Sequence, residues 1–180
     1  MRLILLCALV LGLASGATAQ HDHNHDHGEG PMPTESGVDA SDPVPTGLTA
    51  SGVSGLLAGA GMGLAKPAEL HSYPGPLQVL EHADALALTD AQLATTQALR
   101  AEVVEQASEL GARIVGMERH LDQLFASGEA TPEAVDRITG HIAQAQGQLR
   151  AVHLRAHVAM QAALTPEQIV TYDRLRGHSD

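Results

Sequence analysis

Two long segments of the chain repeat apolar residues at alternating intervals of three and four positions, and this rhythm limits the possible folds more than any other feature. Such an alternation places one apolar stripe along a helix, and two stripes of this kind pack side by side at a shallow angle. Between the segments, Gly128 is a helix stop, Thr131 an N-cap and Pro132 a first helical residue. We therefore predict an antiparallel helical hairpin. Its stripes are Val103, Ala107, Leu110, Ile114, Met117, Leu121 and Leu124, then Ile138, Ile142, Ala145, Leu149, Val152, Ala156, Ala159 and Ala163.

The composition agrees with an all-α fold. Only 2% of the residues are aromatic and none is Trp, which leaves little with which to pack a β-sheet core. Pro74-Gly75-Pro76 is a turn signal, and a short helix is expected from Leu77 to Leu86. Because the hairpin seam is rich in Ala, we expect short flanking helices or a second subunit to cover it.

The N-terminal part of the chain predicts export and a tail. Residues 1–19 combine a basic start, the apolar run Leu3 to Leu13 and a small-residue cleavage signal, so a cleaved signal peptide and a periplasmic location are expected. Residues 20–66 are rich in Pro, Gly, Ser and Thr, which predicts a disordered His-rich tail, although a short helix within Gly52 to Ala65 could dock against the body. Residues 67–180 then form the helical-hairpin domain. The only cysteine, Cys7, is expected to leave with the signal peptide.

A run of histidines follows the expected cleavage site. His21, His23, His25 and His27 alternate with Asp and Asn residues. Neutral imidazole is a good ligand for Zn, Cu and Ni, and a flexible segment can wrap several rings around one ion. We interpret the run as a metal-binding tail; the alternative is a solvated polar tail. Cleavage after Gln20 instead would make a square-planar Cu(II) or Ni(II) site at the amino terminus conceivable.

A second candidate metal site lies in the hairpin. His153 and His157 are four residues apart on one predicted helix, and Met160 follows one turn later, on a flank about 60° or more from the seam. Two imidazoles at this spacing can chelate one ion, and a thioether suits copper. The facing helix offers Glu102, Glu105 or Glu109 as a further ligand, and a partner subunit is another source. The alternative is a histidine pair that is only solvated or hydrogen-bonded, and the isolated His82, His120 and His141 are expected to be surface or packed residues.

The pentapeptide LTxxQ occurs twice, at the expected starts of two helices. In each copy a Thr is followed three residues later by Gln, which is the pattern of a capping box: Thr89 with Gln92, and Thr165 with Gln168. The Leu before each Thr and the apolar residue after each Gln fit a hydrophobic staple, and Pro166 suits the first helical position. The motif is thus explained as helix capping without any chemistry.

An exported helical chain with two LTxxQ motifs resembles the Spy/CpxP family of periplasmic stress proteins, which includes zinc-resistance-associated and heavy-metal-sensing members. The resemblance covers roughly Gly75 to Gly177. It implies a bent helical hairpin, usually a homodimer, that acts as an ATP-independent chaperone, a metal binder, or both. The acidic, aromatic-poor body departs from the basic and apolar surface expected of a cradle for unfolded clients.

Charge and missing motifs exclude other classes. The formal charge is −11, from 21 acidic against 10 basic residues, which disfavours nucleic acid. The sequence has no phosphate loop, HExxH or nucleophile elbow, so neither an enzyme nor an organic cofactor is expected. We expect a metal-binding envelope-stress protein that takes Zn, Cu or Ni. The alternatives are a chaperone for unfolded periplasmic proteins and a regulator that docks to a membrane sensor kinase.

Overall fold

The computed structural model describes residue 39 and residues 41–177. All described residues belong to the second of the two units into which the chain divides, Pro33–Asp180. The predicted signal peptide and the histidine run, His21 to His27, lie outside the described residues.

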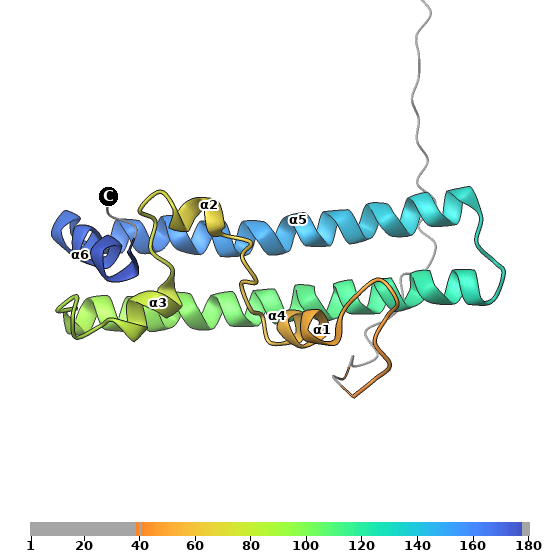
Figure 1. Ribbon diagram of the computed structural model, residues 1–180, viewed down its shortest axis with the longest axis horizontal. Coiled ribbons are helices and arrows are strands. Elements are labelled where there is room, and N and C mark those ends of the chain that lie inside the picture. The colour runs from red at the N-terminus through yellow and green to blue at the C-terminus, as the bar shows by residue number, and fades with distance from the viewer. Residues whose placement is uncertain (1–38, 40, 178–180) are drawn as a thin grey trace, which may run out of the picture. The chain divides into compact units, whose positions relative to one another are not determined.

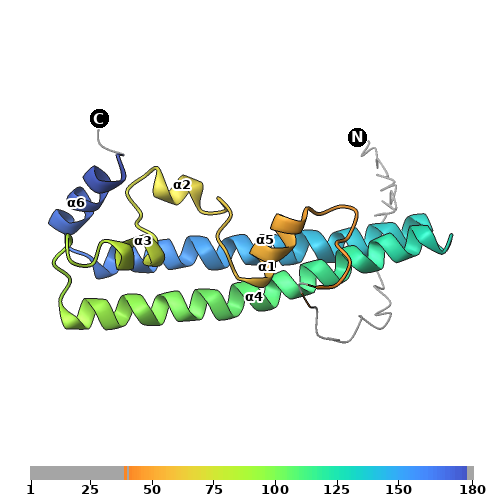
Figure 2. The ribbon, with the colours of Figure 1, turned by 60° about the horizontal axis from the view of Figure 1, so that its bottom comes forward.

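The second unit is built on two long helices, α4 (Asp90–Ala126) and α5 (Pro132–Ala163). They run antiparallel side by side (Figures 1 and 2), as the apolar spacing predicted. Gly128, with φ of 74°, turns the chain between them, and the Thr131 hydroxyl accepts a hydrogen bond from the Ala134 amide at the start of α5. The buried seam consists of residues from both predicted stripes: Val103, Ala107, Ile114, Met117, Ile138, Ile142, Ala145, Leu149, Val152 and Ala156. The all-α hairpin is therefore confirmed.

A short helix, α1 (Ala50–Leu57), packs on α4 within the stretch expected to be disordered. For residues 41–66 the expectation of disorder is wrong, because Val53 and Leu56 bury their side chains in the hairpin core. The two backbones also approach closely: a Cβ on Gly111 of α4 would overlap the carbonyl of Leu56. A docked helix in this region was the alternative that the isolated leucines left open.

The segment before α1 is also fixed to α4. The Arg119 guanidinium lies 3.0 Å from an Asp42 carboxylate oxygen and donates to the carbonyl of Pro43 at 3.3 Å. One turn further on, the Asp122 carboxylate accepts a hydrogen bond of 2.6 Å from the Thr46 amide. These contacts hold the segment at the half of α4 that leads to the hairpin turn.

The other end of the hairpin has a small core of its own. The helices α3 (Pro76–Glu81) and α6 (Pro166–Arg176) contribute to it, and α2 (Lys66–Glu69) packs on α5. The helix expected from Leu77 to Leu86 ends at Glu81, because the chain then passes through turns, with Ala87 at a φ of 48°, to reach the cap of α4. The buried residues of this core are Val79, Leu86, Met160, Leu164 and Tyr172. Among the described residues, no helix is both long enough and apolar enough to cross a membrane.

Candidate functional site

Both LTxxQ motifs form complete capping boxes. At the start of α4, the Thr89 hydroxyl accepts from the Gln92 amide at 3.2 Å, and the Gln92 side-chain oxygen accepts from the Thr89 amide at 3.1 Å. At the start of α6, the matching distances between Thr165 and Gln168 are 3.3 and 2.9 Å. Each box satisfies two backbone donors that a helix start leaves unpaired.

The two motifs also bind each other. The side-chain nitrogen of Gln92 donates to the side-chain oxygen of Gln168 at 2.8 Å, and the reverse bond measures 3.1 Å. The second proton of each amide goes to a backbone carbonyl: Gln92 donates to Ala163 and Gln168 donates to Leu86, at 3.0 and 3.1 Å. Every donor of both part-buried amides is thereby used. The motif glutamines thus tie the start of α4, the end of α5 and the start of α6 together.

Sequence reasoning explained each motif locally and missed this pairing. The sequence nevertheless contained a signal for this pairing. An antiparallel hairpin brings the first residues of one helix beside the last residues of the other. One motif opens the first long helix and the other follows the second, so their glutamines meet at the same end of the hairpin.

The structure buries the histidine pair of the hairpin. His153 is 6% exposed and His157 is 7% exposed, since the chain from Ala60 to Gln78 covers this flank of α5. The alternative of a solvated pair is therefore wrong, whereas a hydrogen-bonded one is right for His157. Met160 is fully buried, but it packs in the small core with Tyr172 and does not line the histidine pocket.

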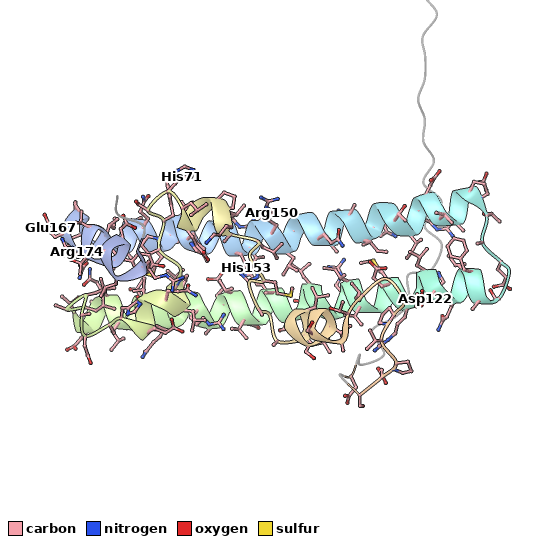
Figure 3. The ribbon with its side chains drawn as sticks, in the orientation of Figure 1. His71, Asp122, Arg150, His153, Glu167 and Arg174 are labelled. Carbon is pink, nitrogen blue, oxygen red and sulfur yellow. The ribbon has the colours of Figure 1, made fainter. Side chains whose placement is uncertain are left out.

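His153 and His157 line one pocket of about 280 Å³ between α4, α5 and the chain around α2. Figure 3 marks His153 between the two long helices. The Nδ1 atom of His157 lies 2.8 Å from the carbonyl oxygen of Tyr73, so this nitrogen carries a proton and donates it to the carbonyl. The Nε2 atom of His153 is buried and has no hydrogen-bond partner among the described residues.

Three causes lower the pKa of His153. Burial has the largest effect, followed by the charges of His157 and of Arg100, which lines the same pocket. All three disfavour the charged imidazolium, so the pKa falls below its ordinary value near 6.5. The fold therefore favours the neutral form of His153.

The pocket fits a metal ion only in part. It supplies two imidazoles and the Glu69 carboxylate, which is not placed with them to hold an ion, whereas Glu102, Glu105 and Glu109 are all exposed on α4 and do not line it. Within the described part of the chain, no three His, Cys, Asp or Glu side chains are placed to hold an ion together. The Arg100 cation beside the imidazoles also opposes a dication. An ion at this pair would therefore need further ligands from elsewhere.

A second, smaller groove of about 210 Å³ contains residues of α4 and α5 only. Its lining is mixed: Glu102, Gln106 and Arg155 add polar groups to five apolar residues. The apolar lining residues are Leu99, Val103, Val152, Ala156 and Ala159.

The structure is an all-helical hairpin whose two LTxxQ motifs cap helices and hydrogen-bond to each other. These features define a protein of the Spy/CpxP type. Residues 78–176 match the LTXXQ motif family, and the chain belongs to that family. The matched region begins in α3 and ends with α6, so it includes both motifs and both long helices. Comparison with curated proteins and with solved structures found no match.

Proposed function

We propose that this protein is a non-enzymatic periplasmic stress protein that binds divalent transition-metal ions, namely Zn, Cu or Ni. The observation that carries the proposal is the run of four histidines at positions 21, 23, 25 and 27, interleaved with carboxylates. This donor set suits borderline divalent metals. Membership of the LTXXQ motif family supports a stress role on a helical scaffold.

The proposal rests on the histidine run and not on the buried pair of histidines. His153 and His157 offer two donors, and their pocket contains the Arg100 cation. A second metal site at this pair and Met160 is still only a prediction. Homodimerisation is also still a prediction.

Calorimetric titration with Zn, Cu(II) and Ni tests the proposal. The chain from Gln20 onward is titrated at about pH 7.5 and about pH 5.5, on either side of the imidazole pKa. We expect tight binding that weakens at the lower pH, because protonated imidazole cannot ligate a metal. Replacing all four tail histidines by Ala should abolish it, whereas the His153→Gln, His157→Gln double variant should retain it. Binding that survives loss of the tail histidines but not of the buried pair would move the site into the hairpin. No binding by the unaltered chain would overturn the proposal.

A second candidate function is client binding as a chaperone, and the groove between α4 and α5 favours it. The groove combines an apolar lining with charges of both signs, which suits an unfolded segment of mixed composition. Ala159→Glu, which places a charge in the groove, should weaken suppression of the aggregation of a chemically unfolded test protein. Ala143→Glu, at another exposed position of α5, is the matched control and should have no effect. Equal effects of the two variants would argue against the groove. Capture of one stoichiometric membrane partner without metal or clients would instead favour the sensor-docking role.

A further inference from the structure

The histidine pocket contains a cation, Arg100, that forms no ion pair within the described part of the chain. Arg100 projects from α4 into the pocket lining and has neither an ion pair nor a hydrogen bond among the described residues. Glu69 also lines the pocket, but its carboxylate lies 3.6 Å from the Lys66 ammonium. Arg100, Glu69 and Lys66 together therefore carry a positive net charge, in a chain whose overall charge is −11.

Hydrogen-bond donors stand beside this cation. His153 is more than nine-tenths buried, and its Nε2 atom has no partner among the described residues. Its Nδ1 atom lies toward Gly61 of the pocket lining, so in the tautomer protonated at Nδ1 the ring donates into the pocket. Gln78 adds a side-chain amide to the lining. A guanidinium with neighbouring N–H donors is the arrangement that binds a carboxylate or a related oxyanion.

The rest of the pocket is apolar and opens to solvent. Ala65, Val103 and Ala156 line its buried side, whereas Met62 and Leu77 are 49% and 40% exposed. The volume of about 280 Å³ lies just below the range of pockets that hold drug-sized molecules. A small ligand with a short apolar body therefore fits better than a bare inorganic ion, which would leave the apolar part of the pocket unfilled.

We propose that this pocket binds a small organic anion: a carboxylate that pairs with Arg100 and His153, on a short apolar body that packs against Val103, Ala156 and Leu77. Binding gives the Arg100 guanidinium a counter-ion and gives the Nδ1 atom of His153 a hydrogen-bond acceptor. The anion occupies the body of the protein, whereas the proposed metal function depends on the tail histidines. The two proposals can therefore fail independently.

Nuclear magnetic resonance titration of the chain from Gln20 onward, in the presence of a chelator, tests this inference. The probes are benzoate, its uncharged analogue benzamide, and inorganic phosphate. We expect benzoate to shift the imidazole resonances of His153 and His157 and the methyl resonance of Met62 in a saturable manner. Benzamide and phosphate should bind at least about tenfold more weakly, since one lacks the charge and the other the apolar body.

Two variants make the test specific. Arg100→Gln should weaken benzoate binding at least about tenfold, because it removes the charge-assisted hydrogen bonds. Arg113→Gln removes the same charge from an exposed position of α4 outside both pockets and should leave the affinity unchanged. Circular dichroism melting checks that both variants fold. The inference would be overturned if benzamide or phosphate bound as strongly as benzoate. Equal affinity of the two variants for benzoate, or the absence of any shift, would also overturn it.

Discussion

Gln92 and Gln168 exchange two side-chain hydrogen bonds, of 2.8 and 3.1 Å, across the end of the hairpin opposite its turn. Each glutamine also completes the capping box of its own helix. The repeated pentapeptide is therefore a tertiary contact built from two local ones. Its two copies hold together the helix ends that close the small core.

Loss of either glutamine should leave its partner with unmet hydrogen bonds. We expect Gln92→Ala or Gln168→Ala to lower the free energy of unfolding by about 2 kcal/mol, since each breaks a cap and strands a part-buried amide. The double variant should cost less than the sum of the singles, with a coupling energy of about 1 kcal/mol in urea unfolding. Gln97→Ala, at an exposed position of α4, should change stability by less than about 0.5 kcal/mol. Strict additivity of the two losses would contradict the pairing.

Gly111 should be needed for α1 to dock. A Cβ at this position would overlap the Leu56 carbonyl, so Gly111→Ala must push α1 away from α4. We expect a loss of about 1–3 kcal/mol in thermal or urea unfolding, despite the better helix propensity of Ala. Gly147→Ala is the control, because a Cβ on this α5 glycine meets nothing within 4 Å. It should stabilise the protein by about 0.5–1 kcal/mol. Stabilisation by both changes would show that α1 is not held against α4.

Arg119 should fix the segment before α1 more than it stabilises the whole fold. The ion pair with Asp42 is partly exposed, so Arg119→Ala should cost no more than about 1 kcal/mol. Hydrogen exchange at the Thr46 amide should nevertheless accelerate, because the segment that Asp122 holds through this amide loses its neighbouring anchor. Arg113→Ala, at an exposed position two turns away on α4, should leave this exchange rate unchanged. Unaltered exchange in the Arg119 variant would refute the anchoring role.

Burial of neutral His153 should make stability depend on pH. Its pKa is lowered in the fold, so below about pH 6.5 the unfolded chain takes up a proton that the folded state resists. This contribution is fully present above that pH and is lost as the pH falls toward the lowered pKa. The groups that face His153 are Arg100 from α4, His157 from α5 and Glu69 from α2. In urea unfolding between about pH 7.5 and pH 5, His153→Gln should flatten the decline in stability, and His141→Gln should not. A decline of the same steepness in the His153 variant would disprove the assignment.

The long helices were predictable because their stabilising pattern is local and periodic. The spacing from Val103 to Leu124 needs no knowledge of the partner to specify an apolar stripe, and the Thr89 and Thr165 caps follow from residues three positions apart. Residues 41–66 were less predictable. Their isolated Val53 and Leu56 become a docking face only because α4 places Gly111 opposite them.

The candidate site residues were likewise predictable only in part. The spacing of His153 and His157 put both on one flank, but it gave no sign that the chain from Ala60 to Gln78 would bury them beside Arg100. Met160 shares their flank in sequence yet packs into the neighbouring core, because α3 and α6 close over it. The expected carboxylate ligands, Glu102 among them, remain exposed on α4.

The sequence alone determined the all-α class, the hairpin, its turn and both capping boxes, because each depends on residues within a few positions of one another. Only the tertiary structure decided that Gln92 bonds Gln168, that α1 packs on α4, and that two histidines share a pocket with Arg100, which has no ion pair within residues 41–177. These contacts join residues far apart in the chain. Their geometry depends on how the helices pack, and no local pattern encodes that packing.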